Sequence, residues 1–153
     1  MLESLKSFFS RNVQPAASPS GEAESARRLR IAACALLLEL AYADDEFTDD
    51  ERAHIEDSLM RHFELDANTA RELIQIAEEE RREATDLHQF TSLINRHYDE
   101  GQRMVLAEVF WRIVYADGRL AERESMLSRK LASLLELRPG YLAEARKRAL
   151  GSE

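Results

Sequence analysis

Cysteine, proline, glycine and long apolar runs are all scarce in this chain of 153 residues, which contains a single Cys, 3 Pro and 5 Gly. One cysteine cannot form an internal disulfide, and it excludes a thiolate metal cluster. We expect Cys34, which is set among Ala and Leu, to pack in the core as a small apolar residue. With 44% apolar and 33% charged residues, the scarcity of Pro and Gly favours a helical protein over a β-rich or disordered one.

Long apolar segments and positive charge are also in short supply. The longest apolar run, residues 31–43, spans 13 residues and contains Glu39, whereas a membrane span takes about 20 apolar residues. The N-terminus lacks the cationic start and long apolar centre of a signal peptide, so we expect a cytoplasmic protein. The net charge of -8 repels phosphate backbones and anionic lipids over most of the surface, so we expect no nucleic-acid partner.

Apolar residues recur at helical spacing along almost the whole chain. The expected helices cover residues 2–11, 26–43, 49–63, 70–82, 86–101, 102–114, 121–135 and 141–149. The helices over 26–43 and 102–114 are apolar nearly all round, which is typical of central helices. The sequence therefore predicts an all-α fold, a compact bundle of about seven helices.

The N-terminal segment differs from the rest in composition. Leu2, Leu5, Phe8 and Phe9 give residues 2–11 one apolar face, and residues 14–25 are rich in Ala, Ser and Pro, as in a flexible linker. We predict a short amphipathic helix and linker over residues 1–25, and a helical domain over residues 26–150. The helix is either a frayed end or a cap on this domain, or it contacts a partner groove or a membrane surface. Membrane contact would place the protein at the periphery of the inner membrane.

One short motif occurs twice. Tyr42-Ala43-Asp44-Asp45 returns as Tyr115-Ala116-Asp117-Gly118, and each first Asp is followed seven residues later by a Glu, Glu51 in the first copy and Glu124 in the second. A single fixed offset relates the two copies, and each copy ends an apolar helix and begins a charged one. The pattern indicates an internal duplication of a helix-loop-helix unit.

Two explanations account for the repeated Glu. Thr48 and Glu51 have the spacing of a capping box, in which Thr48 caps the helix and Glu51 binds the amide of the cap residue. In the second copy, however, Ala121 stands at the position of Thr48, so capping does not explain Glu124. The alternative is a cation site, because an Asp and a Glu that bracket a tight loop can converge on one point.

Hard cations such as Ca²⁺ or Mg²⁺ bind clustered oxygens of this kind. Residues 44–57 hold eight Asp and Glu against one Arg, whereas the second copy is set among Arg and Lys. The first copy is therefore the stronger candidate for a cation site. The loop is not an EF-hand, because Asp49 and Ile55 occupy the positions that require Gly and Glu.

Sequence motifs for catalysis are missing. The chain has no His-Glu-x-x-His, no Gly-x-Ser-x-Gly, and no glycine motif for phosphate or dinucleotide binding. We expect the histidines at surface or cap positions; they are His54, His62, His88 and His97. The sequence therefore predicts that the protein is not an enzyme and needs no cofactor other than a divalent cation.

The run Tyr-Ala-Asp-Gly-Arg-Leu-Ala-Glu-Arg-Glu at residues 115–124, with its first copy at Tyr42, resembles the tellurite-resistance TerB superfamily, which also occurs attached to DnaJ-like proteins. The resemblance spans about residues 26–149. It implies a compact all-α fold with internal duplication and a divalent-cation site at Asp44 and Glu51 in the first motif and Asp117 and Glu124 in the second. The chain departs from the family pattern at Asp45, where the family has Gly.

Two functions follow as expectations. The first is a cation-binding accessory module in a stress response such as tellurite resistance. The second is a metal-free scaffold that binds a protein partner, adjacent to a membrane through weak contact of residues 2–11.

Overall fold

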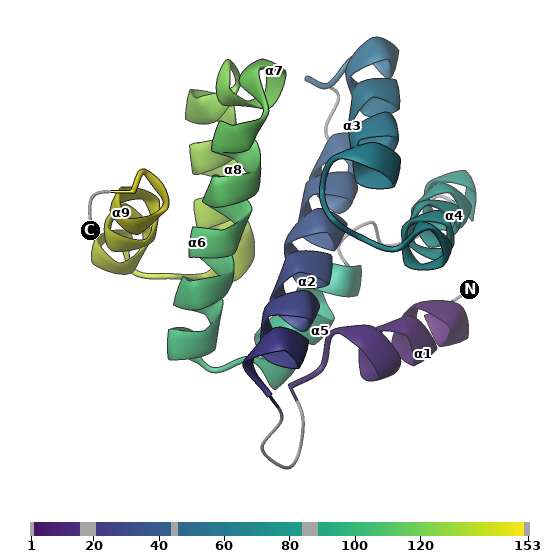
Figure 1. Ribbon diagram of the computed structural model, residues 1–153, viewed down its shortest axis with the longest axis horizontal. Coiled ribbons are helices and arrows are strands. Elements are labelled where there is room, and N and C mark those ends of the chain that lie inside the picture. The colour runs from purple at the N-terminus through teal and green to yellow at the C-terminus, as the bar shows by residue number, and fades with distance from the viewer. Residues whose placement is uncertain (1, 16–20, 44–45, 84–88, 152–153) are drawn as a thin grey trace.

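A computed structural model describes residues 2–15, 21–43, 46–83 and 89–151. These residues form helices and no strand, which confirms the predicted all-α fold (Figure 1). The helices are α1 (Leu2–Asn12), α2 (Glu22–Ala43), α3 (Asp49–Arg61), α4 (Ala67–Glu83), α5 (Gln89–His97), α6 (Glu100–Ala116), α7 (Gly118–Ala121), α8 (Glu124–Leu135) and α9 (Pro139–Ala149). Within the described part of the chain, no helix is long and apolar enough to cross a membrane.

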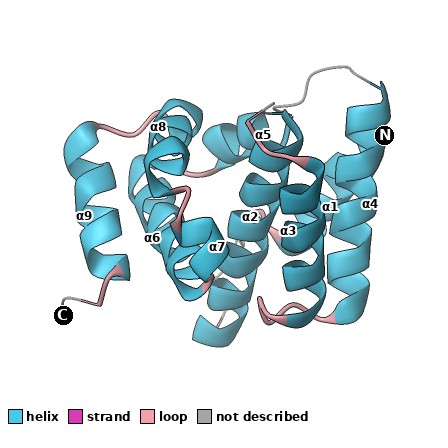
Figure 2. Cartoon of the chain, turned by 90° about the horizontal axis from the view of Figure 1, so that it is seen from above, coloured by secondary structure: helices cyan, strands magenta, loops and turns pink. Residues whose placement is uncertain are grey.

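The duplicated unit is the organising feature of the fold. Helices α2 and α6 pack against each other, α4 packs on α2, and α9 packs on α6 (Figure 1). We call α2, α3 and α4 the first repeat, and α6, α8 and α9 the second repeat. Seen from above, α9 lies at one end of the molecule, and α1 and α4 lie together at the other (Figure 2).

The register between the repeats changes along the unit. The first helices, α2 and α6, align at their last residues, Ala43 and Ala116. The third helices, α4 and α9, align at their first residues, Ala67 and Pro139, and the offset between these two positions is one residue smaller than the offset between the first helices. We call this smaller offset the shorter register. The buried residues of α3 and α8 also match in this shorter register; they are Ile55 and Leu59 in α3 and Leu127 and Leu131 in α8. One residue is therefore missing from the second repeat between its acidic corner and the buried face of α8.

The core is built around α2, on which every residue from Ile31 to Ala41 is buried. A helix with apolar side chains on all sides is stable only when other helices surround it. Cys34 lies in this stretch with no exposed surface, and burial raises the pKa of its thiol well above the ordinary value. The expectation of an unreactive core cysteine is confirmed.

Helix α1 packs against α4 and α5. Its side chains Leu5, Phe8 and Phe9 are at most 2% exposed, and the rings of Phe9 and Phe90 meet edge to face at 5.6 Å. The hydroxyl of Tyr98 donates a hydrogen bond to the carbonyl of Val13 at 2.7 Å. In the structure this segment therefore caps the helical domain, as the cap alternative expects.

The linker expected over residues 14–25 is shorter than its composition indicates. Helix α2 begins at Glu22, because Glu22 and Glu24 stabilise a helix N-terminus and Arg28 binds Glu24 at 2.8 Å one turn later. Residues 16–20 lie outside the described residues. The division into residues 1–25 and 26–150 stays a prediction.

The helix expected over residues 121–135 begins a few residues later than its pattern indicates. A one-turn helix, α7, precedes α8, which begins at Glu124 rather than Ala121. The carboxylate of Asp117 explains this difference, because it caps α7 and so starts a helix ahead of the position that the charge pattern indicates.

Candidate functional site

The first acidic corner connects α2 to α3, and the predicted capping box holds the start of α3. The hydroxyl oxygen of Thr48 accepts a hydrogen bond from the backbone N–H of Glu51 at 3.1 Å, and Glu51 Oε1 accepts one from the N–H of Thr48 at 2.8 Å. Two amides at the helix start are thereby satisfied. Asp44 and Asp45, the other acidic residues of this motif, lie outside the described residues.

In the second corner, Asp117 makes bonds on both carboxylate oxygens. Oδ1 accepts from the backbone amides of Arg119 at 3.0 Å and Leu120 at 3.2 Å. Oδ2 accepts from Nε2 of His54 at 2.8 Å and from the hydroxyl of Ser58 at 3.3 Å. Both of these donors lie on α3, so this carboxylate joins the two repeats.

The environment of Asp117 favours its charged form. Burial alone would raise the pKa of this carboxyl, but the hydrogen bonds from His54 and from the amides of Leu120 and Arg119 together lower it. His54 was expected at a surface or cap position, and this expectation is wrong. Its sequence neighbours gave no signal, because the partner lies 63 residues away.

Glu124 binds inside the second repeat. Its Oε2 accepts a hydrogen bond from the Tyr115 hydroxyl at 2.8 Å and lies 3.3 Å from Nε of Arg146. Burial and the carboxylate of Glu124 raise the pKa of Tyr115 to about 12. Because Tyr115 belongs to α6 and Arg146 to α9, Glu124 links these two helices to the start of α8.

Arg123 connects the two corners. Its Nε lies 3.3 Å from Glu51 Oε2, its guanidinium donates a hydrogen bond to the carbonyl of Glu46, and its Cζ lies 5.2 Å from the ring centre of Phe47. A pocket of about 170 Å³ lies between the corners. A guanidinium thus neutralises Glu51 from the other repeat, a role that the sequence did not predict for Arg123.

The described carboxylates do not converge on one point. Glu51 pairs with Arg123, Glu124 pairs with Arg146, and Asp117 is bound by His54. No three His, Cys, Asp or Glu side chains among the described residues are grouped closely enough to hold a metal ion. Calcium takes six or more oxygen ligands. The described part of the two corners therefore does not supply such a ligand set by itself.

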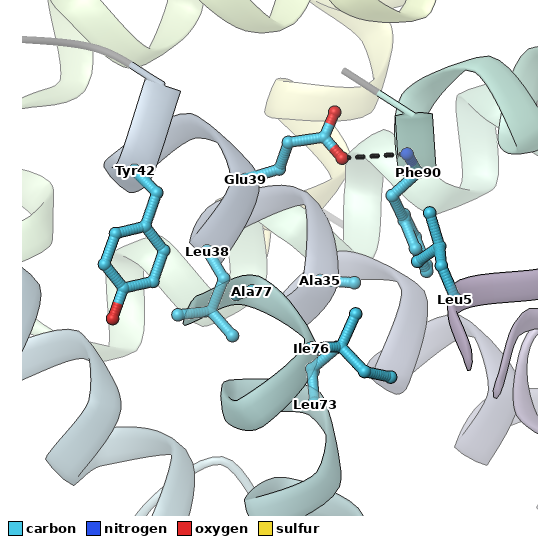
Figure 3. Close-up of a pocket in the computed structure, with 9 residues that line it drawn as sticks. All are labelled: Leu5, Ala35, Leu38, Glu39, Tyr42, Leu73, Ile76, Ala77 and Phe90. Atoms are coloured by element: carbon cyan, nitrogen blue, oxygen red, sulfur yellow. Dashed lines mark hydrogen bonds between the residues drawn. The ribbon is translucent and has the colours of Figure 1, made fainter. Parts of the chain in front are cut away.

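A buried carboxylate outside the repeated motif belongs to Glu39, near the end of α2. Glu39 accepts a hydrogen bond from the backbone amide of Phe90 at 3.0 Å (Figure 3). It also accepts hydrogen bonds from the backbone amide of Thr91 at 3.3 Å and from the Thr91 hydroxyl at 2.7 Å. It thereby satisfies amides in the first turn of α5, where a negative charge is favourable. Its signal in the sequence is that it is the one charged residue in the apolar run 31–43.

The duplicated unit, the central helix pair and the paired acidic corners define a helical module built from two copies of one helical unit. A model of the family described as tellurite resistance protein TerB matches residues 30–147, and the chain belongs to this family. The comparison with curated proteins found no match, and no solved structure matches the chain. TerB is a non-catalytic helical domain family.

Proposed function

We propose that this chain is a non-enzymatic TerB-type module that acts by binding another protein in a stress response such as tellurite resistance. One observation carries the proposal: each described carboxylate of the repeated motif is bound by a donor from another helix. The bonds of Asp117 and Glu51 hold the two repeats together, and those of Glu124 hold the helices of the second repeat together. No described carboxylate of the repeated motif is left free to act on a substrate. The repeated motif then serves to hold a rigid binding surface in shape.

The cluster of His54, Ser58 and Asp117 supports a structural role over catalysis. A serine nucleophile needs a histidine that accepts its proton. Here His54 and Ser58 both bind the same oxygen of Asp117, so the carboxylate is the acceptor for each and His54 is not the base for Ser58. Ser58 is also only 1% exposed, out of reach of a substrate.

Crosslinking in cells tests the proposed function. A photoreactive residue is placed in turn at Val105 and Tyr141, which are 39% and 37% exposed, and the cells are illuminated with and without tellurite. We expect a discrete adduct with one protein. Adducts no more specific than those of an unrelated helical protein carrying the same group would contradict protein binding.

Cation binding at the first corner is the second candidate function. Residues 44–57 carry eight Asp and Glu against a single Arg, and this Arg, Arg52, binds Asp49 at 2.9 Å. Arg123 and Arg129 offset part of this charge at Glu51 and Glu46, and an excess of carboxylates at this density favours a divalent cation. The ligands would include Asp44 and Glu51; Asp117 and Glu124 are the weaker pair, because the second copy is set among Arg and Lys.

Calorimetric titration with Ca²⁺ and with Mg²⁺ tests this second candidate. Saturable heat that Asp44→Asn and Glu51→Gln abolish, and that Asp117→Asn leaves in place, would support a site at the first corner. Wild-type protein that gives no saturable heat at millimolar metal would exclude it.

Contact of residues 2–11 with a membrane surface would carry a structural cost. Leu5, Phe8 and Phe9 of α1 are buried, so they reach lipid only if α1 leaves the core. Flotation with anionic vesicles tests this, and binding that persists after deletion of residues 2–11 would rule out their role.

A further inference from the structure

A groove of about 430 Å³ opens between α8 and α9 of the second repeat. Trp111 of α6 lines it, Ser128 and Ala132 line it from α8, and Leu142 and Leu150 line it from α9. Leu150, at the end of α9, is 59% exposed, the largest exposed fraction among the large apolar side chains described. The groove thus has an apolar lining and an open side.

The first repeat closes the same interface with longer side chains. The shorter register aligns Ile55 of α3 with Leu127 of α8. In this register Glu56 of α3 corresponds to Ser128, and Met60 corresponds to Ala132. Helix α3 packs against α4. Glu56 also shares a hydrogen bond with Glu78 of α4. The second repeat has lost both long side chains from this face of α8, and this loss of volume leaves the groove.

The residues on the α9 side of the groove also differ from their counterparts in α4 of the first repeat. Ile74 and Glu78 of α4 correspond to Arg146 and Leu150 at the end of the chain in the same register. The carboxyl that pairs with Glu56 in the first repeat is therefore replaced by an exposed Leu. In the first repeat, the pair of Glu56 and Glu78 closes this interface. In the second repeat, the same place is an apolar surface in contact with water, and covering such a surface is favourable.

Charge indicates the kind of partner. Residues 124–150, which include α8 and α9, contain six Arg and Lys and three Glu, whereas the whole chain has a net charge of -8. Arg146 and Lys147 line the groove itself. This region has an excess of positive charge within an acidic protein, so it attracts an acidic segment and orients it.

We propose that the groove between α8 and α9 binds an acidic amphipathic segment of a partner protein. An aliphatic or aromatic side chain of that segment packs over Trp111 between Ser128 and Leu150, and its carboxylates face the basic residues of α9. Helices that bind in grooves place apolar anchors in this way. The inference rests on the proposed protein-binding function and assigns it a surface and a partner chemistry.

Fluorescence titration with synthetic peptides tests the proposal. Trp111 is the single Trp of the chain and lines the floor of the groove with 1% of its surface exposed, so its emission responds to a change in the packing around the groove. Three helical peptides of equal length serve as probes: one with Glu and Leu, one with Lys and Leu, and one with Glu and Ala. We expect the Glu and Leu peptide to change the emission at micromolar concentration and to bind at least about tenfold more tightly than the other two. Equal binding of all three peptides would overturn the proposed chemistry.

Two sets of variants of the full chain locate the binding site. Ser128→Gln with Ala132→Met refills the groove with side chains of the size found in the first repeat, and we expect it to abolish binding while the thermal unfolding temperature stays the same or rises. Lys147→Glu should weaken binding, whereas Lys6→Glu, the same change of charge on the exposed side of α1, should not. Full binding by the refilled variant would overturn the proposal.

The outcomes also separate this proposal from the proposed function. If a partner crosslinks in cells, and the refilled variant crosslinks equally well, protein binding stands and the groove is not its site. If neither the crosslink nor the peptide binding is observed, both proposals fail. Binding of anionic vesicles or of a single-stranded oligonucleotide that the refilled variant abolishes would overturn the proposal by assigning the groove to a different class of partner.

Discussion

The third helices of the two repeats, α4 and α9, each pack on a central helix, but they differ in which other helices they contact. In the first repeat, α4 contacts α3 on one side and α1 on the other. In the second repeat, α9 packs chiefly on α6, with the groove between it and α8. The comparison shows that one backbone plan, used twice, yields a closed interface or an open one according to a few side chains.

Side chains also decide where α1 docks. Leu5 of α1 packs beside Ala35 and Ile76 of the first repeat. The corresponding positions of the second repeat, each taken in the register of its own helix, are Glu108 and Arg148. Glu108 forms an ion pair with Arg112 on that face. Charged residues therefore leave no apolar surface there for a helix such as α1.

Removing an anchor of α1 should have the largest effect on this comparison. Phe8 has no exposed surface, so Phe8→Ala should lower the free energy of unfolding by about 3 to 5 kcal/mol. Urea unfolding followed by circular dichroism measures the loss. Ser4→Ala, on the exposed side of the same helix, is the control; an equal, small effect of the two changes would show that α1 is not part of the core.

The next largest change in stability is expected at Glu39. Arg112 occupies the same position in the second repeat. Glu39→Ala leaves three buried donors of Phe90 and Thr91 without their acceptor. We expect a loss of about 2 to 3 kcal/mol. Arg112→Ala, at an exposed residue, should change stability by less than about 0.5 kcal/mol. Chemical denaturation of both variants measures the difference, and similar losses at both positions would mean that the repeats are equivalent here.

Asp117→Asn tests the connection between the repeats. We expect a loss of about 1 to 2 kcal/mol at pH 7, because hydrogen bonds to a charged group stabilise more than those to an amide. The pKa of Asp117 is lowered in the folded protein, so its contribution is present above the ordinary value of 3.8 and is lost as the pH falls through the lower folded value. Urea unfolding at a series of pH values should show the variant differing from wild type at pH 7 and approaching it in strong acid. A constant difference at all pH values would contradict this role.

The smallest effect concerns Glu56, which Ser128 replaces in the second repeat. Burial and the neighbouring carboxyl of Glu78 raise the pKa of Glu56 from 4.5 to about 7. A raised folded pKa means that the contribution is complete below about 4.5 and is lost as the pH rises through about 7. Because Glu56 is partly exposed, solvent screening limits the change to about 1 kcal/mol.

Thermal unfolding from pH 5 to pH 8 measures this effect. Wild-type protein should lose stability over that range, and Glu56→Gln, which keeps a neutral side chain, should lose less. Asp57→Asn, on the exposed side of α3, serves as the control and should keep the wild-type slope. A slope that Glu56→Gln does not reduce would mean that the carboxyl pair does not couple α3 to α4.

Much of the fold could be predicted from local patterns. The apolar run from Ile31 to Ala41 predicts the central helix, and the capping box at Thr48 predicts the start of α3, because each signal is contained in a few neighbouring residues. The repeat at Asp44 and Asp117 predicts the duplication. Periodicity does not count residues across a turn, so it did not reveal the change of register between the repeats.

The candidate site was predicted only in part. Asp117 and Glu51 were identified as candidate site residues from the repeated motif. The partner of Asp117 is His54 and the partner of Glu51 is Arg123; each partner comes from the other repeat and is distant in sequence. Glu51 is the third residue of α3 and Glu124 the first residue of α8. Equal spacing from an Asp therefore did not give the two residues equal surroundings.

The sequence by itself determined the helices, the duplication and the membership of the TerB family, since apolar periodicity, caps and repeated motifs are local. The tertiary structure decided which charges meet, where α1 lies, and which of two equivalent interfaces stays open. Those outcomes depend on side chains from different helices that share one space, and neighbours in space are not neighbours along the chain.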